Sequence, residues 1–166
     1  MKPFYLNLTF KDWQRKIEKI KSFLSPCRLC PRNCQVDRLK EEKGFCRLGS
    51  KAVVSSFHPH FGEEKCLVGK GGSGTIFFAH CNLACLYCQN YDISQLDQGR
   101  EVKKEELVAM MIELQSLGCE NINFVTPTPH ISSIIEALPL AIKKGLKIPL
   151  VYNTSEIGRA SCMERV

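Results

Sequence analysis

Hydrophobic side chains recur at intervals of three and four residues between Thr9 and Leu24. That spacing is the period of one face of an α-helix. Thr9, with Asp12 three residues later, has the pattern of a helix N-cap. The sequence therefore predicts an N-terminal helix that packs one face against the rest of the protein.

The second half of the chain alternates short apolar runs with longer amphipathic stretches. The runs Thr75–Ala79, Asn121–Val125 and Ile148–Tyr152 have the length and composition of buried parallel strands. The stretches Lys103–Leu117 and Ile131–Lys144 have helical spacing, and a glycine follows each. This pattern predicts an α/β fold in which right-handed helical crossovers join three parallel strands. In such sheets the chemistry gathers at the carboxyl ends of the strands.

Composition indicates a globular protein of one compact unit. The chain has 166 residues, of which 44% are hydrophobic and 24% charged, enough to bury a core. No apolar run approaches the roughly 18 residues that span a bilayer, and residues 1–12 lack the apolar stretch of a signal peptide. We therefore expect a cytoplasmic protein with no membrane partner.

Charge is unevenly distributed along the chain. The formal net charge is +6, yet residues 1–55 contain 13 Lys and Arg against 5 Asp and Glu. A nucleic acid or an acidic protein is one possible partner for this basic half, and a solvated basic face is the simpler interpretation.

Cysteines form two groups in this chain. With no export signal, the ten cysteines are expected to stay reduced, and clustered reduced thiols usually bind metal. The first group lies in Ser25–Gly49, a segment without periodicity that needs another means of folding. We predict a second metal site there, for zinc or for an iron–sulfur cluster, formed by Cys27, Cys30, Cys34 and Cys46.

The second group has the spacing C-x3-C-x2-C and directly follows the first predicted strand. Three thiolates on one loop can each bind a different iron of a 4Fe-4S cluster, which leaves the fourth iron without a protein ligand. A structural zinc with a distant fourth ligand is the alternative. Simple reduced thiols are a further alternative. We predict a 4Fe-4S site at Cys81, Cys85 and Cys88, because zinc loops more often contain two C-x2-C pairs and need no buried strand just upstream.

This loop and its surroundings resemble a known family. C-x3-C-x-aromatic-C after the first strand of an α/β sheet is similar to the radical S-adenosylmethionine (SAM) superfamily, with Tyr87 as the aromatic residue. The strings "GSGTIFFAHCNLACLYCQNYDIS", "NINFVTPTPH", "IPLVYNTS", "CRLCPRNCQVDR", "GFCRLG" and "HFGEEKCLVG" resemble an uncharacterised branch of pyruvate formate-lyase activating-enzyme-like proteins. The resemblance runs from about Cys27 to Ser155.

The resemblance implies both a fold and a reaction. The fold would be the first part of a radical SAM (β/α) partial barrel, truncated after its third strand. SAM would chelate the open iron and be cleaved reductively to methionine and a 5′-deoxyadenosyl radical, so the chemistry is borne by the cofactor. Implied partners are an electron donor such as flavodoxin or ferredoxin and a glycyl radical enzyme as target. Modification of RNA or a peptide, and a non-catalytic iron–sulfur electron carrier, are the alternatives.

Four residues are candidates for contact with SAM. Tyr87 would lie near the adenine, and Asn153 after the third strand could bind the carboxylate or ribose. The family's glycine-glycine-glutamate motif is replaced here by Val125–Pro129, in which Thr126 and Thr128 offer hydroxyls. His80 stands where related sequences usually have glycine.

The final residues resemble something other than protein-coding sequence. Residues 156–166 are similar to the translation of a common sequencing adapter. We accordingly divide the chain into an N-terminal helix (1–24), a Cys-rich module (25–68), a truncated radical SAM core (69–155) and a non-native tail (156–166). A core cut after three strands is expected to be inactive by itself.

Overall fold

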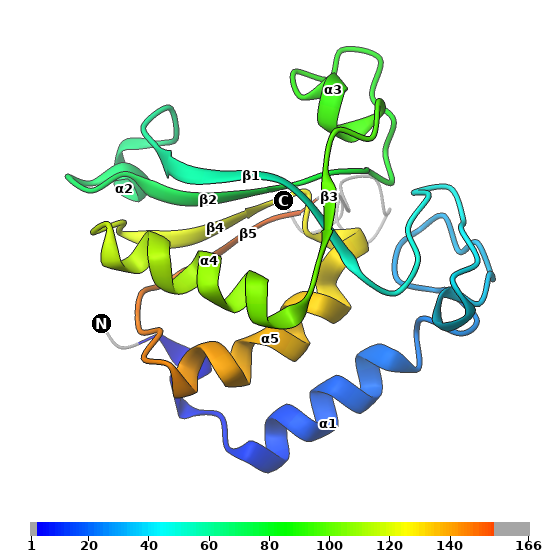
Figure 1. The fold of residues 1–166 in the computed structure, drawn as a ribbon, viewed down its shortest axis with the longest axis horizontal. Helices are drawn as coiled ribbons and strands as arrows, with labels where there is room; N and C mark the ends of the chain where they lie inside the picture. Colours follow the sequence, from blue (N-terminus) through cyan, green and yellow to red (C-terminus); the bar gives the residue numbers. More distant parts are fainter. Residues whose placement is uncertain (1–2, 155–166) are drawn as a thin grey trace, which may run out of the picture.

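The computed structural model describes residues 3–154 (Figure 1). The predicted tail at 156–166 lies outside the described residues. The helices are α1 (Phe10–Lys21), α2 (Lys65–Val68), α3 (Tyr91–Ser94), α4 (Lys104–Ser116) and α5 (Ile131–Lys143), with short 3-10 turns η1 (Phe4–Asn7), η2 (Arg38–Lys40) and η3 (Thr128–His130). The strands are β1 (Ala52–His60), β2 (Ser73–Phe78), β3 (Arg100–Val102), β4 (Asn121–Val125) and β5 (Leu150–Asn153).

The sheet is mixed, with strand order β3-β1-β2-β4-β5. Strands β2, β4 and β5 are parallel, as predicted, whereas β1 and β3 are antiparallel additions on the far side of β2. The expectation of a three-stranded, purely parallel sheet was therefore wrong by two strands. Pro59 disfavours a strand prediction, because proline cannot donate to a ladder. It lies beyond the three residues of β1 that pair with β3, where no donor is needed.

The predicted helices are confirmed, and most of their ends lie within a residue or two of the predicted ones. The exception is α1, which ends at Lys21 and not at Leu24. Helix α1 begins with a capping box, since the Asp12 backbone N–H donates to Thr9 Oγ1 at 3.3 Å and the Thr9 N–H donates to Asp12 Oδ2 at 2.9 Å. Helices α4 and α5 are followed by Gly118 and Gly145, whose φ angles of +86° and +94° suit glycine best.

Long helices cover one face of the sheet. The other, which we call the open face, is covered in part by the segment that contains α2, since Asn121 and Asn123 donate to Leu67 and Glu63. Figure 1 shows α4, α5 and α1 stacked on one side of the sheet. Ile76, Phe78, Ile122 and Phe124 point into that side and are at most 2% exposed. The residues between them, such as Thr75 and the asparagines of β4, alternate to the other face. Among the described residues β5 has a partner strand on one side only.

The Cys-rich segment between α1 and β1 contains one regular element, the three-residue turn η2. Arg38 in that turn is 1% exposed and donates from Nε to the Gly49 carbonyl at 2.8 Å and from Nη1 to the Pro129 carbonyl at 3.0 Å. A buried guanidinium therefore joins this segment to the turn after β4. Strand β1, also within the predicted 25–68 module, enters the sheet directly.

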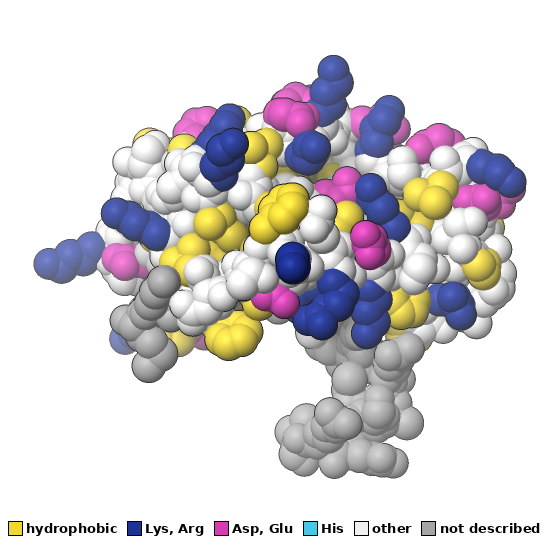
Figure 2. Space-filling view, turned by 90° about the horizontal axis from the view of Figure 1, so that it is seen from below, with side chains coloured by type: hydrophobic (Ala, Val, Ile, Leu, Met, Phe, Trp, Pro, Cys, Tyr) yellow, Lys and Arg dark blue, Asp and Glu magenta, His cyan; other side chains and the backbone are white. Residues whose placement is uncertain are grey.

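Charged side chains are mixed on the face formed by α1. Figure 2 shows Lys and Arg spread across that face with Asp and Glu between them. Among the described residues no helix is long and apolar enough to cross a membrane.

Candidate functional site

The second cysteine group lies on a loop that follows β2. We call residues 81–93 the thiol loop. The strand before it is fixed by the Ala79 N–H, which donates to the Val53 carbonyl at 3.0 Å. The two ends of the loop meet where the His80 N–H donates to the Ile93 carbonyl at 2.8 Å. Both ends of the thiol loop therefore lie at the carboxyl edge of the parallel strands, as predicted.

The three thiols of this loop are accessible. Cys85 is exposed, and Cys81 and Cys88 are partly exposed. The Leu83 N–H donates to Cys81 Sγ at 3.4 Å, and Cys88 Sγ lies 3.2 Å from Ser94 Oγ. Within residues 3–154 no three His, Cys, Asp or Glu side chains are arranged as a ready-made metal site. Three reduced thiols on one accessible loop nevertheless form the donor set that a 4Fe-4S cluster requires.

An arginine from the first cysteine group holds the thiol loop. Arg32 donates from Nε to the Asn82 carbonyl at 2.9 Å and from Nη2 to the Leu83 carbonyl at 3.1 Å. The Arg32 guanidinium lies 3.7 Å from the centre of the Phe45 ring, which fixes its plane. The two cysteine segments are therefore in direct contact, although about 50 residues separate them.

A charged group flanks the start of the loop. Arg47 lies 2.7 Å from the Asp97 carboxylate, and the same carboxylate oxygen lies 3.1 Å from His80 Nδ1. Burial lowers the pKa of His80, against the opposing effect of Asp97. Lys43, Arg47, Lys51 and Glu101 line a hollow of about 150 Å³ beside His80. Two of these cations are paired, because Arg47 contacts Asp97 and Lys51 lies 2.8 Å from Glu101.

His130, which the sequence analysis did not select, supports the strand below the loop. It is 1% exposed and stacks on Phe78 with ring centres 4.6 Å apart. Nε2 lies 2.8 Å from the Ala79 carbonyl, and the Val53 N–H points to Nδ1 at 3.5 Å. These contacts require the neutral ring with its proton on Nε2. Burial lowers the pKa of His130 to about 3.

A groove of about 310 Å³ lies on the open face of the sheet beside the loop. It is lined by Gln89 and Asn90 of the loop and by Asn153 at the end of β5. Its volume is in the range of small-molecule sites, and its amide side chains are hydrogen-bonding groups. Asn153 is the predicted SAM-contacting residue that the structure brings next to the thiol loop.

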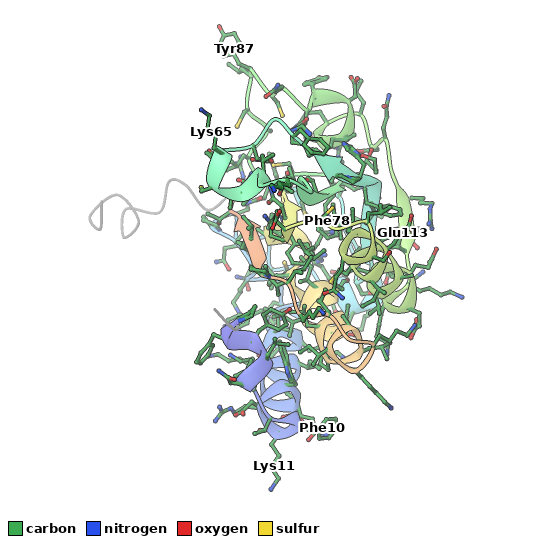
Figure 3. All side chains as sticks on the ribbon, turned by 90° about the vertical axis from the view of Figure 1, so that its left-hand side faces the viewer. Phe10, Lys11, Lys65, Phe78, Tyr87 and Glu113 are labelled. Carbon is green, nitrogen blue, oxygen red and sulfur yellow. The ribbon has the colours of Figure 1, made fainter. Side chains whose placement is uncertain are left out.

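The other three predicted residues are placed differently. Tyr87 is 99% exposed and projects from the tip of the loop (Figure 3). Thr126 follows β4 with a positive φ of 59°. Thr128 is buried in η3, lines a separate pocket with Tyr152, and accepts a hydrogen bond from that tyrosine at 3.3 Å. The structure thus does not bring Thr128 and Asn153 to one pocket.

The first cysteine group converges on a single small cavity. Cys27, Cys30, Cys34 and Cys46 all line it, and its volume is about 10 Å³. Burial raises the pKa of the Cys30 and Cys46 thiols, and neighbouring thiols of the group add to that rise.

The two remaining described cysteines lie away from the thiol loop. Cys119 is 3% exposed in the core before β4, at the amino edge of the sheet. Cys66 in α2 is exposed. Since Cys119 is at the opposite edge of the sheet, it is not positioned to be a fourth ligand of a cluster on the thiol loop.

Comparison with curated proteins finds two uncharacterized archaeal relatives. Over 148 residues the chain is 36% identical to Uncharacterized protein MJ0674 of Methanocaldococcus jannaschii, a match that covers 84% of this chain and 41% of that protein. It is 26% identical to Uncharacterized protein MJ0808 of the same organism over 159 residues, covering 82% and 45% of the two chains. The chain thus spans less than half the length of these relatives. No solved structure matches significantly.

A family comparison matches residues 75–161 to the Radical SAM superfamily. The match covers more than half of the chain, begins in β2 and includes the whole thiol loop, whereas the first cysteine group lies outside it. The chain therefore belongs to the radical SAM superfamily.

Proposed function

We propose that the protein is an iron–sulfur enzyme that cleaves SAM reductively. The observation that supports this most directly is the C-x3-C-x2-C loop, which lies inside the family match at the carboxyl edge of the parallel strands. Cys81, Cys85 and Cys88 would bind three irons of a 4Fe-4S cluster. When bound, the cluster supplies the electron that splits the sulfonium of SAM and yields a 5′-deoxyadenosyl radical.

The polypeptide would position these groups. Arg32 holds two carbonyls of the thiol loop, and neutral His130 holds the carbonyl that precedes it. Both contacts restrict the motion of the cysteine backbone and favour one loop conformation. Gln89, Asn90 and Asn153 would donate hydrogen bonds to the polar groups of SAM in the groove that they line. Tyr87 and Thr126 remain predicted SAM contacts.

A non-catalytic electron carrier is the rival function. It would need a fourth protein ligand for the cluster. Cys66 and Cys119 lie in segments that lead into the amino ends of β2 and β4, at the edge of the sheet opposite the thiol loop. Their positions favour an open iron and hence SAM binding.

The finer target that we propose is a backbone glycine of a glycyl radical enzyme. This proposal rests on the sequence resemblance to activating enzymes and on the position of β5, which is an edge strand among the described residues. An electron donor such as flavodoxin or ferredoxin is the partner that would reduce the cluster. RNA or peptide modification is the alternative target class.

The test uses the protein in the longest form that its source gene encodes. Anaerobically reconstituted and reduced protein should convert SAM to 5′-deoxyadenosine and methionine, measured by chromatography and mass spectrometry. Cys85→Ala should abolish the products, and Cys66→Ala, at an exposed thiol outside the loop, should retain them. A fully reconstituted cluster that forms neither product would contradict the proposal. Incubation with a glycyl radical enzyme should then produce a glycyl EPR signal.

A further inference from the structure

The first cysteine group is built from two short chain segments that the backbone brings together. The Cys27 N–H donates to the Val36 carbonyl at 2.8 Å, and the Gln35 N–H donates back to the Cys27 carbonyl at 3.1 Å. A turn closes where the Asn33 N–H donates to the Cys30 carbonyl at 3.1 Å. Three of the four cysteines are thereby placed on one tight hairpin.

The second segment brings the fourth cysteine against this hairpin. Gly44 lies so close to it that a Cβ at this position would be 2.8 Å from Cys34 Cβ and 2.9 Å from Cys34 Sγ. The Phe45 N–H donates to Cys34 Sγ at 3.4 Å. Cys46 then reaches the cavity that the other three thiols line.

Backbone amides point at the sulfur atoms. Besides the Phe45 amide, which donates to Cys34 Sγ, the backbone amides of Arg32 and Leu48 face Cys30 and Cys46, where they oppose the rise in thiol pKa that burial causes. In both latter cases the donor lies two residues after the cysteine. Such bonds favour a thiolate over a thiol and fix the direction of the cysteine side chain.

We propose that Cys27, Cys30, Cys34 and Cys46 bind one Zn²⁺ ion as a closed tetrathiolate site. The four thiols line one cavity between the two chain segments that carry them. A cavity of about 10 Å³ accommodates one ion or water, whereas an eight-atom cluster would require both segments to move apart. Because protein thiolates fill all four positions, the site is structural rather than catalytic. Binding releases the thiol protons and turns the sulfur atoms inward, since the described side chains are not already arranged as a coordination sphere.

The zinc site would act on the thiol loop through Arg32, which lies between Cys30 and Cys34. With the hairpin fixed by metal, the guanidinium is held where it bonds the Asn82 and Leu83 carbonyls. Zinc would therefore order the segment that in turn positions the iron-binding loop.

The test uses the full chain with Cys81, Cys85 and Cys88 replaced by Ser, so that iron binding at the thiol loop does not contribute. The metal-free, reduced protein is titrated with Co²⁺ and then with Zn²⁺. We expect one Co²⁺ per chain, with the visible and charge-transfer absorption of a tetrahedral thiolate site, and its loss after one equivalent of Zn²⁺.

Further substitutions separate ligand loss from misfolding. Cys34→Ser should lose stoichiometric binding, Cys46→His should keep it because imidazole is also a zinc ligand, and Cys66→Ser should leave it unchanged. Retained thiolate absorption in Cys34→Ser would overturn the site. Failure of the parent to bind Co²⁺, or assembly of several irons with sulfide at these four cysteines, would overturn the single-ion proposal.

Discussion

Replacing His130 with Gln should weaken the dependence of stability on pH. The neutral ring bonds the Ala79 carbonyl and stacks on Phe78, and burial lowers its pKa from 6.5 to about 3. Between these two pKa values the unfolded chain binds a proton at this histidine and the folded chain does not, so the free energy of unfolding falls as pH falls. From pH 7.5 to 5.5 the loss from this one group is about 1.4 kcal/mol, at 1.36 kcal/mol per pKa unit.

Urea unfolding measures this effect through the fluorescence of Trp13, which is the single tryptophan and is 5% exposed. The wild type should lose more stability than His130→Gln over this pH range, with a difference of about 1.4 kcal/mol. His80, whose pKa burial also lowers, contributes to both proteins and cancels in the comparison. His58→Gln, at an exposed position, should behave like the wild type. Equal pH dependence in wild type and His130→Gln would refute the assignment of a buried neutral histidine.

Two further predictions concern the thiol loop and the sheet edge. Arg32→Ala should lower the amount of iron retained after gel filtration, because two hydrogen bonds to loop carbonyls are lost. Arg28→Ala, in the same segment but stacked on Phe23, should retain wild-type iron. Equal iron retention in the two variants would contradict the role of Arg32 in holding the thiol loop. Among the described residues β5 has no partner on its outer side, so the chain should self-associate in ultracentrifugation. Val151→Lys should reduce this association, and a monomeric wild type would contradict the argument.

Local patterns in the sequence were sufficient to predict the long helices and the parallel strands. Helix α4 and strand β4 have clear periodicity or apolar character, and both were predicted within one residue. Strand β1 was missed because its apolar start at Ala52 gives way to a mixed run containing Pro59, and its place depends on pairing with β2 and β3. Strand β3 has three residues, too few for a periodic signal.

The candidate site was also predictable only in part. The spacing of Cys81, Cys85 and Cys88 is local and readable, and so is the placement of their loop after a strand. The contacts of Arg32 and His130 with the loop and the preceding strand join residues about 50 positions apart, and no local pattern indicates them.

The candidate SAM contacts depend on sheet register. Asn153 reaches the open face because it pairs with Val125 across the parallel strands. Thr128 lies in a 3-10 turn that buries it near Tyr152 instead. Two residues that both follow strands in the sequence therefore lie in different pockets.

The most direct test of a SAM-accessible cluster at the thiol loop is EPR spectroscopy of the reduced, anaerobically reconstituted chain with and without saturating SAM. The account predicts about four irons bound through Cys81, Cys85 and Cys88, and an EPR signal that SAM changes. Cys85→Ala should lack the SAM-sensitive signal, while Cys66→Ala should keep it. A spectrum that saturating SAM leaves unchanged would contradict the account and favour an electron carrier with a fully ligated cluster.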